Sequence, residues 1–164
     1  NNINVIPYGG GTSVVGHMNP DGHGKLNLTI SLAKMTSLLD LDPISLLARF
    51  QPGANGPQIE NQLNEEGFTL GHFPQSWEYS TLGGWIASRS SGQQSLKYGR
   101  IENLFAGGKI VTPKGTLVIP TCPASSAGPD LRQFLLGSEG RMGIITEASV
   151  RISPLPKSEY IGAV

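Results

Sequence analysis

The sequence predicts a single α+β domain, and three observations lead to that prediction. Its 164 residues have the length of one domain and can bury a sizeable core. Short stretches with the alternation of strands are mixed with three stretches of helical spacing, without the regular strand–helix alternation of a doubly wound fold. The 22 glycines gather into short clusters between apolar stretches, which suits loops that bring bare backbone close to a neighbour.

Five stretches carry the pattern of strands. Residues 144–153 alternate most clearly, since Ile144, Thr146, Ala148, Val150 and Ile152 share one face of an extended chain. Residues 110–119 predict a hairpin with its turn at 113–115. The remaining strands are expected at residues 4–7, 28–32 and 46–50.

Three helices are expected from their end signals. Pro57 suits the first position of a helix because its missing N–H would have no partner there, and Gly67 suits a left-handed end. A second helix begins near Ser80 or Thr81, whose hydroxyls can cap it. Asp130 can cap a third, short helix.

Composition excludes several classes of partner. Twelve basic residues balance 12 acidic ones, so no basic face is predicted for nucleic acid or an anionic membrane surface. The sequence has no apolar run of the roughly 20 residues that a membrane span needs, and no signal-peptide pattern. Cys122 is the single cysteine, which excludes an internal disulfide and fits a reducing, intracellular compartment.

The first glycine cluster, Gly9-Gly10-Gly11, follows a predicted strand and precedes Thr12 and Ser13. Consecutive glycines let backbone N–H groups converge into a nest for a phosphate or pyrophosphate. The dinucleotide fingerprint fails because Val14 stands where its third glycine belongs, and the P-loop fails because Leu26 follows Gly24-Lys25. Simple turn chemistry is the alternative for this cluster.

Two further clusters can contact a ligand. Residues 74–84 place hydroxyls and then Gly83-Gly84 at the start of a predicted helix, where unpaired N–H groups attract anions. The glycines there weaken the helix by about 1 kcal/mol each, which a closely packed planar ligand or helix–strand packing would explain. Residues 137–146 form a glycine-rich turn that opens onto the final strand.

Neither a metal site nor a nucleophile is predicted. His17, Asp21 and His23 lie in one Gly/Pro-rich loop without ligand spacing, and His72 is distant in sequence. Cys122 has no base nearby, and no G-x-S-x-G elbow occurs.

The clusters occur in an order that is found in a known family. The segments that carry the likeness cover nearly the whole chain: residues 7–13, 71–76, 79–86, 89–92, 98–104, 111–115 and 137–147. On these segments the chain resembles the FAD-binding domain of the vanillyl-alcohol-oxidase/PCMH superfamily, the FAD-linked oxidases. Within that superfamily it is most similar to the subgroup of alkyldihydroxyacetonephosphate synthases. The resemblance implies a PCMH-type fold with mixed and antiparallel sheets flanked by helices.

The resemblance also implies where FAD is held. The pyrophosphate loop would be Pro7, Tyr8, Gly9, Gly10, Gly11, Thr12 and Ser13. The flavin and its ribityl chain would meet Gln75, Ser76, Trp77, Glu78, Tyr79, Ser80, Thr81, Gly83, Gly84, Ser88, Arg89, Ser90 and Ser91. Further cofactor contacts would come from Glu139, Gly140, Arg141, Met142, Gly143, Ile144 and Ile145. In related enzymes that link the flavin through this loop a His follows the glycines, whereas Thr12 stands here, so noncovalent FAD is expected.

By the same resemblance we expect a fragment. Residues 1–156 would be the FAD-binding domain without the family's first strand–helix–strand unit, and 157–164 would begin the connection to a missing cap domain. In the family the cap domain handles the small-molecule substrate and supplies acid–base residues, so no catalytic residue is assigned. A homo-oligomer is compatible with the sequence.

Three functions remain open. The first is an enzyme like the synthases, in which FAD serves an acyl-to-alkyl exchange on a dihydroxyacetone phosphate ester. The second is an FAD-dependent dehydrogenase or oxidase of a 2-hydroxy acid such as lactate or glycolate. The third is a noncatalytic domain that has lost the flavin.

Overall fold

The computed structural model describes residues 3–20, 22, 24–158 and 162. Its centre is a five-stranded antiparallel sheet in the order β3-β4-β8-β6-β7. The strands are β3 (Leu38–Asp42), β4 (Leu47–Phe50), β6 (Phe105–Thr112), β7 (Gly115–Ile119) and β8 (Ile144–Arg151). The predicted α+β class is therefore confirmed.

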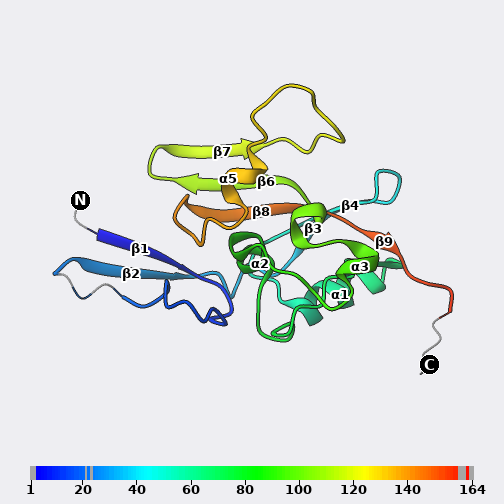
Figure 1. The fold of residues 1–164 in the computed structure, drawn as a ribbon, viewed down its shortest axis with the longest axis horizontal. Helices are drawn as coiled ribbons and strands as arrows, with labels where there is room; N and C mark the ends of the chain where they lie inside the picture. Colours follow the sequence, from blue (N-terminus) through cyan, green and yellow to red (C-terminus); the bar gives the residue numbers. More distant parts are fainter. Residues whose placement is uncertain (1–2, 21, 23, 159–161, 163–164) are drawn as a thin grey trace.

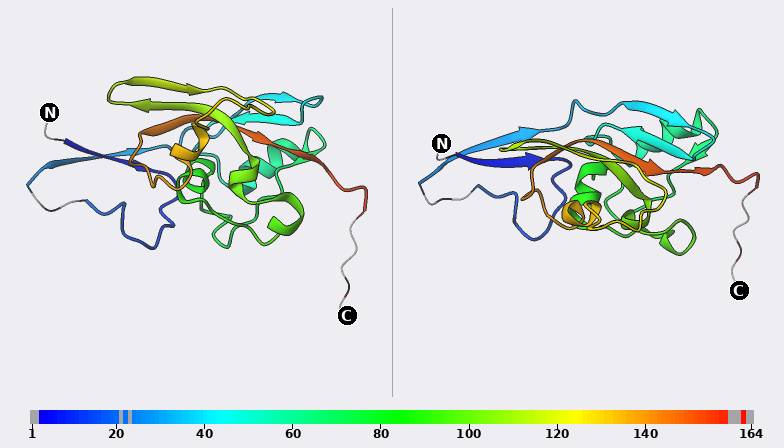
Figure 2. Two further views of the ribbon diagram at one scale, coloured as in Figure 1. Left: turned by 45° about the horizontal axis from the view of Figure 1, so that its top comes forward. Right: turned by 90° about the horizontal axis from the view of Figure 1, so that it is seen from above.

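Five helices accompany this sheet in the part of the chain that the structure describes. They are α1 (Gly56–Asn64), α2 (Leu82–Ser88), α3 (Ser95–Tyr98), α4 (Ile101–Leu104) and α5 (Arg132–Leu135). Helices α2, α4 and α5 lie on one face of the sheet, as Figure 1 and the view from above in Figure 2 show. None of the helices within the described residues has the length and apolarity that crossing a membrane requires.

Two small sheets complete the domain. Strands β1 (Ile3–Tyr8) and β2 (Leu26–Ser31) pair in parallel and extend to one side of the main sheet (Figure 1). Strands β5 (Phe68–Thr69) and β9 (Ser153–Pro154) pair antiparallel. The chain thus returns at 153–154 to the segment that follows α1.

The hydrophobic core lies between the main sheet and its helices. Apolar side chains from the strands meet those from α1, α2 and α4, and burying each large side chain contributes roughly 1.5–3 kcal/mol. The fully buried members include Phe50, Ile59, Leu63, Leu82, Ile86, Ile101, Phe105 and Val150. This core fixes α2 against the sheet.

The predicted alternation of the last strand is correct over part of its length. Ala148, Val150 and Ile152 are buried as expected, but Ile145 belongs to the core in place of Ile144 and Thr146. The register shifts within β6, where Lys109 pairs with Glu147 and the next residue pairs with Ile145. This bulge leaves one extra residue in β8, which switches the face of every residue before it.

Helix α1 begins as predicted, with Pro57 in its first turn, and Gly67 is left-handed with φ +83°. The sequence prediction missed its N-cap. The Asn55 side chain accepts a hydrogen bond from the Gln58 N–H, and the Gln58 side chain accepts one from the Asn55 N–H, both at 3.0 Å. This reciprocal pair is a capping box.

Helix α2 departs from its predicted cap. Thr81 is the N-cap residue, but its hydroxyl makes no capping bond, and the Ser80 hydroxyl donates to the Ser76 carbonyl. A helix start without a side-chain cap leaves backbone N–H groups to be satisfied in other ways. The start of α5 follows the prediction more closely, since the Asp130 carboxylate accepts a hydrogen bond from the Arg132 N–H at 3.0 Å.

Candidate functional site

The three glycine-bearing segments line one cavity of about 330 Å³. Figure 1 shows its setting, where the loop after β1 meets α2. The first loop contributes residues 9–15, 17 and 18, the segment around α2 contributes Pro74, Ser76, Ser80, Thr81, Gly84, Trp85, Ala87, Ser88 and Ser90, and the loop after α5 contributes Glu139. The turns therefore face one another, as a shared binding site requires.

The first loop lies directly on the turn before α2. A Cβ atom built on Gly10 would be 1.9 Å from the Tyr79 carbonyl oxygen, and one on Gly9 would be 2.4 Å from Thr81 Oγ1. Gly11 has φ +70°, a left-handed conformation that other residues rarely adopt. The glycines are thus needed for the close approach of two segments far apart in the sequence.

The third loop is fixed to the end of α2. The Gly137 N–H donates to the Ile86 carbonyl at 3.1 Å, and the Glu139 N–H donates to the Ala87 carbonyl at 2.8 Å. The bond to the Ala87 carbonyl satisfies a group that the end of the helix leaves without an intrahelical partner, whereas the Ile86 carbonyl also accepts from the Arg89 N–H at 3.3 Å. Helix α2 therefore lines the cavity and also fixes the position of the third loop.

The hydroxyl groups of the cavity differ in what they can still bind. Ser80 Oγ donates to the Ser76 carbonyl and Ser88 Oγ donates to the Gly84 carbonyl, each at 2.8 Å, so both protons are used within the protein. Thr81 is only 6% exposed, yet its Oγ1 has no hydrogen-bond partner among the described residues. A buried polar atom without a partner is costly, and a bound ligand would satisfy it.

A buried histidine contacts one of the serines that line the cavity. His72 is 1% exposed, and its Nε2 lies 2.7 Å from Ser90 Oγ. Burial lowers the pKa of His72 from 6.5 to about 4, so its ring is neutral at pH 7. The preceding turn is held by the buried Glu60 carboxylate, which accepts bonds from Thr69 Oγ1 at 2.7 Å and from the Gly71 N–H at 3.1 Å.

Several of the predicted site residues lie outside this cavity. Gln75, Trp77, Glu78 and Tyr79 line a neighbouring cavity of about 280 Å³, together with Ser76. Pro7, Gly140, Arg141, Gly143 and Ile144 line a cavity of about 540 Å³ between β1–β2 and the β6–β7 hairpin. Tyr8, Gly83, Arg89, Ser91, Met142 and Ile145 line none of these three cavities.

Three of these outlying residues have structural contacts within the protein. The Arg89 Nε–H donates to the Leu136 carbonyl at 3.1 Å. A Cβ on Gly83 would be 2.9 Å from the Pro52 side chain, and Ile145 lies in the core.

The sequence analysis missed some residues of the cavity. Val14, Val15 and Met18 continue the first loop, and Ala87 lies on α2. The spacing of residues 81, 84 and 88 places them on one helical face, and this spacing could have indicated the neighbouring Ala87.

One of the histidines considered as a metal ligand lies in the cavity. His17 lines the cavity, with Nδ1 3.3 Å from Ser13 Oγ and 3.9 Å from Glu139 Oε2. Asp21 and His23 lie outside the described residues. Within the described part of the chain, no group of three or more His, Cys, Asp or Glu could hold a metal ion.

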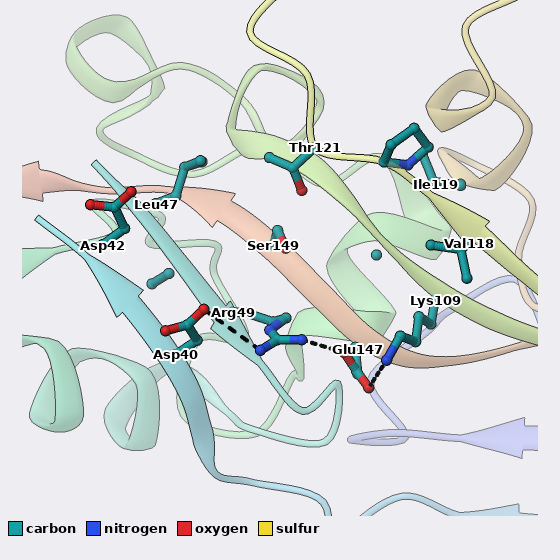
Figure 3. A pocket seen from close by; sticks show the side chains of 13 residues that line it. Asp40, Asp42, Leu47, Arg49, Lys109, Val118, Ile119, Thr121, Glu147 and Ser149 are labelled. Carbon is teal, nitrogen blue, oxygen red and sulfur yellow. Dashed lines mark hydrogen bonds and ion pairs between the residues drawn. The ribbon is translucent and has the colours of Figure 1, made fainter. Parts of the chain in front are cut away.

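A larger cavity of about 420 Å³ lies on the opposite face of the main sheet, where Figure 3 shows a row of charged side chains. Lys109 Nζ lies 2.7 Å and Arg49 Nη1 lies 3.1 Å from the Glu147 carboxylate, and Asp40 lies 3.6 Å from Arg49. The hydrogen bond from Lys109 is the main cause that lowers the pKa of Glu147. Because these charges satisfy one another, the glycine-lined cavity is the better candidate site.

Comparison with known proteins shows which family the chain resembles. A family model described as FAD binding domain matches residues 1–119. The chain is 43% identical over 162 residues to alkyldihydroxyacetonephosphate synthase of Dictyostelium discoideum, covering 98% of this chain and 26% of that protein. It is 35% identical over 167 residues to mitochondrial D-lactate dehydrogenase (cytochrome) 1 of Saccharomyces cerevisiae, covering 100% of this chain and 28% of that protein.

The fold shows the same relationship. A solved structure of alkyldihydroxyacetonephosphate synthase superposes with a TM-score of 0.91 at 41% identity, covering 96% of this chain and 28% of that one. The chain thus spans about a quarter of the length of the relatives that it matches. With the matching family model and the shared fold, the chain belongs to the FAD binding domain family, and its cofactor is FAD.

Proposed function

We propose that the glycine-lined cavity holds FAD noncovalently and that this chain is the FAD-binding part of a flavoenzyme. The observation that carries the proposal is Thr81 Oγ1, a buried hydroxyl without a partner among the described residues, in the wall of a cavity formed by three separate glycine-bearing segments. Bound flavin supplies the redox chemistry, and the protein binds and orients it.

The residues present fit the two halves of the cofactor. Backbone N–H groups of residues 9–13 suit the pyrophosphate, because a glycine nest holds an anion without a basic side chain. The hydroxyls of Thr81 and Ser90 and the small residues Gly84 and Ala87 suit the sugar alcohol chain and the flat ring system. The contacts expected from Gln75–Tyr79 and from 140–145 remain part of the proposal.

The experiment that tests the proposal begins with the purified full-length protein. We expect the visible absorption bands of flavin, and we expect acid precipitation to leave FAD in the supernatant because Thr12 offers no covalent attachment. Flavin that stays with the precipitated protein would refute noncovalent binding. Protein that takes up no FAD after incubation with it would refute the function and support a noncatalytic domain.

For the whole protein we propose an activity like that of the alkyldihydroxyacetonephosphate synthases. The identities to these synthases are 41–44%, whereas those to the D-lactate dehydrogenases are 31–35%. We place the FAD-binding domain at 1–156, with 157–164 leading to a substrate-binding cap domain. A small-molecule substrate would bind between the two domains.

The second candidate is oxidation of a 2-hydroxy acid, favoured by the match to D-lactate dehydrogenase over the whole chain. Anaerobic mixing with D-lactate or glycolate separates the two activities. Bleaching of the flavin absorbance by either acid supports the dehydrogenase. Unchanged absorbance, together with exchange of an acyl for an alkyl chain on dihydroxyacetone phosphate, supports the synthase.

A further inference from the structure

His72 is a buried titratable side chain that the proposed site does not itself use. It is 1% exposed and packs edge-on against Trp85, with ring centroids 5.0 Å apart. Nε2 lies 2.7 Å from Ser90 Oγ, and Nδ1 is buried without a hydrogen-bond partner among the described residues. His72 lies outside the lining of the glycine cavity, whereas Trp85 and Ser90 belong to it.

These contacts determine where the ring carries its proton. A neutral imidazole has one N–H and one lone pair, and the hydrogen bond made by one nitrogen selects the tautomer. A buried N–H without an acceptor is rarer in proteins than a buried acceptor without a donor. Nδ1 therefore carries the lone pair, and Nε2–H donates to Ser90 Oγ.

The direction of this bond leaves the Ser90 hydroxyl proton available. Ser90 accepts from His72, and no second protein group among the described residues accepts from its hydroxyl. Ser80 and Ser88 line the same cavity, but their hydroxyl protons go to the Ser76 and Gly84 carbonyls. Ser90 is thus a serine of this wall that is arranged to donate into the cavity.

We propose that His72 is a positioning residue, which holds Ser90 so that the Ser90 hydroxyl donates a hydrogen bond to an acceptor atom of the bound flavin. The acceptor is a carbonyl oxygen, a hydroxyl oxygen or an unprotonated ring nitrogen. The proposal rests on the proposed function, since it assigns the cavity to FAD. It gives the cofactor site a supporting layer of the kind that fixes ligand-binding side chains in other proteins.

The test compares variants that keep or remove the donor. In His72→Gln the longer amide can present an N–H near Nε2, in His72→Asn the shorter amide lies near Nδ1, and His72→Phe keeps the ring without a donor. Ser90→Ala removes the hydroxyl, and Ser149→Ala, on the opposite face of the sheet, is the matched control. The measurements are the Kd for FAD by flavin fluorescence and the absorption spectrum of bound flavin.

We expect Ser90→Ala, His72→Phe and His72→Asn each to bind FAD on the order of 10-fold more weakly, as the loss of one hydrogen bond predicts. We expect His72→Gln to restore both the affinity and the spectrum. The double variant H72F/S90A should be no weaker than either single variant, because both remove the same interaction. Ser149→Ala should bind like the wild type.

The outcomes separate this inference from the proposed function. A wild-type protein without FAD affinity refutes the proposed function. Wild-type binding combined with unchanged affinity and spectrum in Ser90→Ala refutes the inference alone. Additive losses in the double variant also refute it, because His72 and Ser90 would then act independently. If His72→Phe does not fold, equal affinities of Ser90→Ala and Ser90→Thr decide against the inference.

Discussion

Replacing Thr81 with valine should make the free protein more stable and its FAD complex weaker. Valine has nearly the shape of threonine, so the substitution removes the hydroxyl without opening a cavity. Thr81 is 6% exposed, and its Oγ1 has no partner among the described residues. Burying a polar atom without a hydrogen bond costs about 1–3 kcal/mol, and the valine variant avoids that cost.

The sizes of both effects can be estimated from the free energy of one hydrogen bond. We expect the unfolding free energy of the FAD-free protein to rise by about 1 kcal/mol in T81V. We expect the FAD affinity to fall by about 10-fold if the hydroxyl meets a neutral acceptor, and by roughly 100-fold if it meets a phosphate oxygen. Urea unfolding and fluorescence titration measure the two effects separately.

Thr69 provides the matched control. It is 5% exposed, but its Oγ1 donates to the Glu60 carboxylate at 2.7 Å and accepts from the Gly71 N–H at 3.1 Å. Thr69→Val should therefore lose about 1–3 kcal/mol of stability. A loss of stability in T81V would show that the Thr81 hydroxyl has a structural partner, and an unchanged FAD affinity would show that it does not bind FAD. Either result would refute the reasoning.

Two other predictions concern the glycine loop and the buried histidine. In Gly10→Ala the first loop must move about 1.5 Å from the Tyr79 carbonyl to reach ordinary contact at 3.4 Å, so the FAD affinity should fall on the order of 100-fold. Gly22→Ala is the control, because a Cβ there lies in open space and the variant should bind FAD like the wild type. Equal FAD affinities of the two variants would contradict this prediction. The unfolded chain binds a proton at His72 below pH 6.5 and the folded chain only below about 4, so the FAD-free protein should lose about 3 kcal/mol as the pH falls through that window. The lowered pKa of Glu147, whose ordinary value is 4.5, costs stability only near the acid end of that window, and the lowered pKa values of Asp42 and Asp130 act mainly below it. All three contributions are shared by His72→Gln and the wild type. The variant should therefore have a flatter urea-unfolding profile than the wild type between pH 6.5 and 4, and equal slopes would contradict this assignment.

The sequence predicted those helices and strands that are determined by residues close together in the chain. Pro57 and Gly67 marked α1 because each stabilises a helix end through its own backbone conformation. The β6–β7 hairpin followed from a turn between two alternating stretches. The switch of faces at Ile145 was not predictable, because the bulge depends on how β8 pairs with β6, which is distant in the sequence.

The candidate site was also predictable only where it depends on residues close together in the chain. The glycine clusters indicated where backbone comes close to another group, but for Gly10 that group is the Tyr79 carbonyl of the protein itself. The partnership of His72 with Ser90 spans 18 residues and has no sequence pattern. The availability of each hydroxyl also depended on its neighbours, since Ser88 bonds to its own helix whereas Thr81 has no such partner.

Hydrogen–deuterium exchange of the full-length protein, with and without FAD, tests most directly whether the three glycine-bearing segments form one cofactor site. We expect FAD to slow exchange in all three segments together, at residues 9–13, 80–90 and 137–143. We expect unchanged exchange in residues 115–119 at the far edge of the main sheet. Protection confined to one of the three segments, or located on the face around Arg49 and Glu147, would contradict the account.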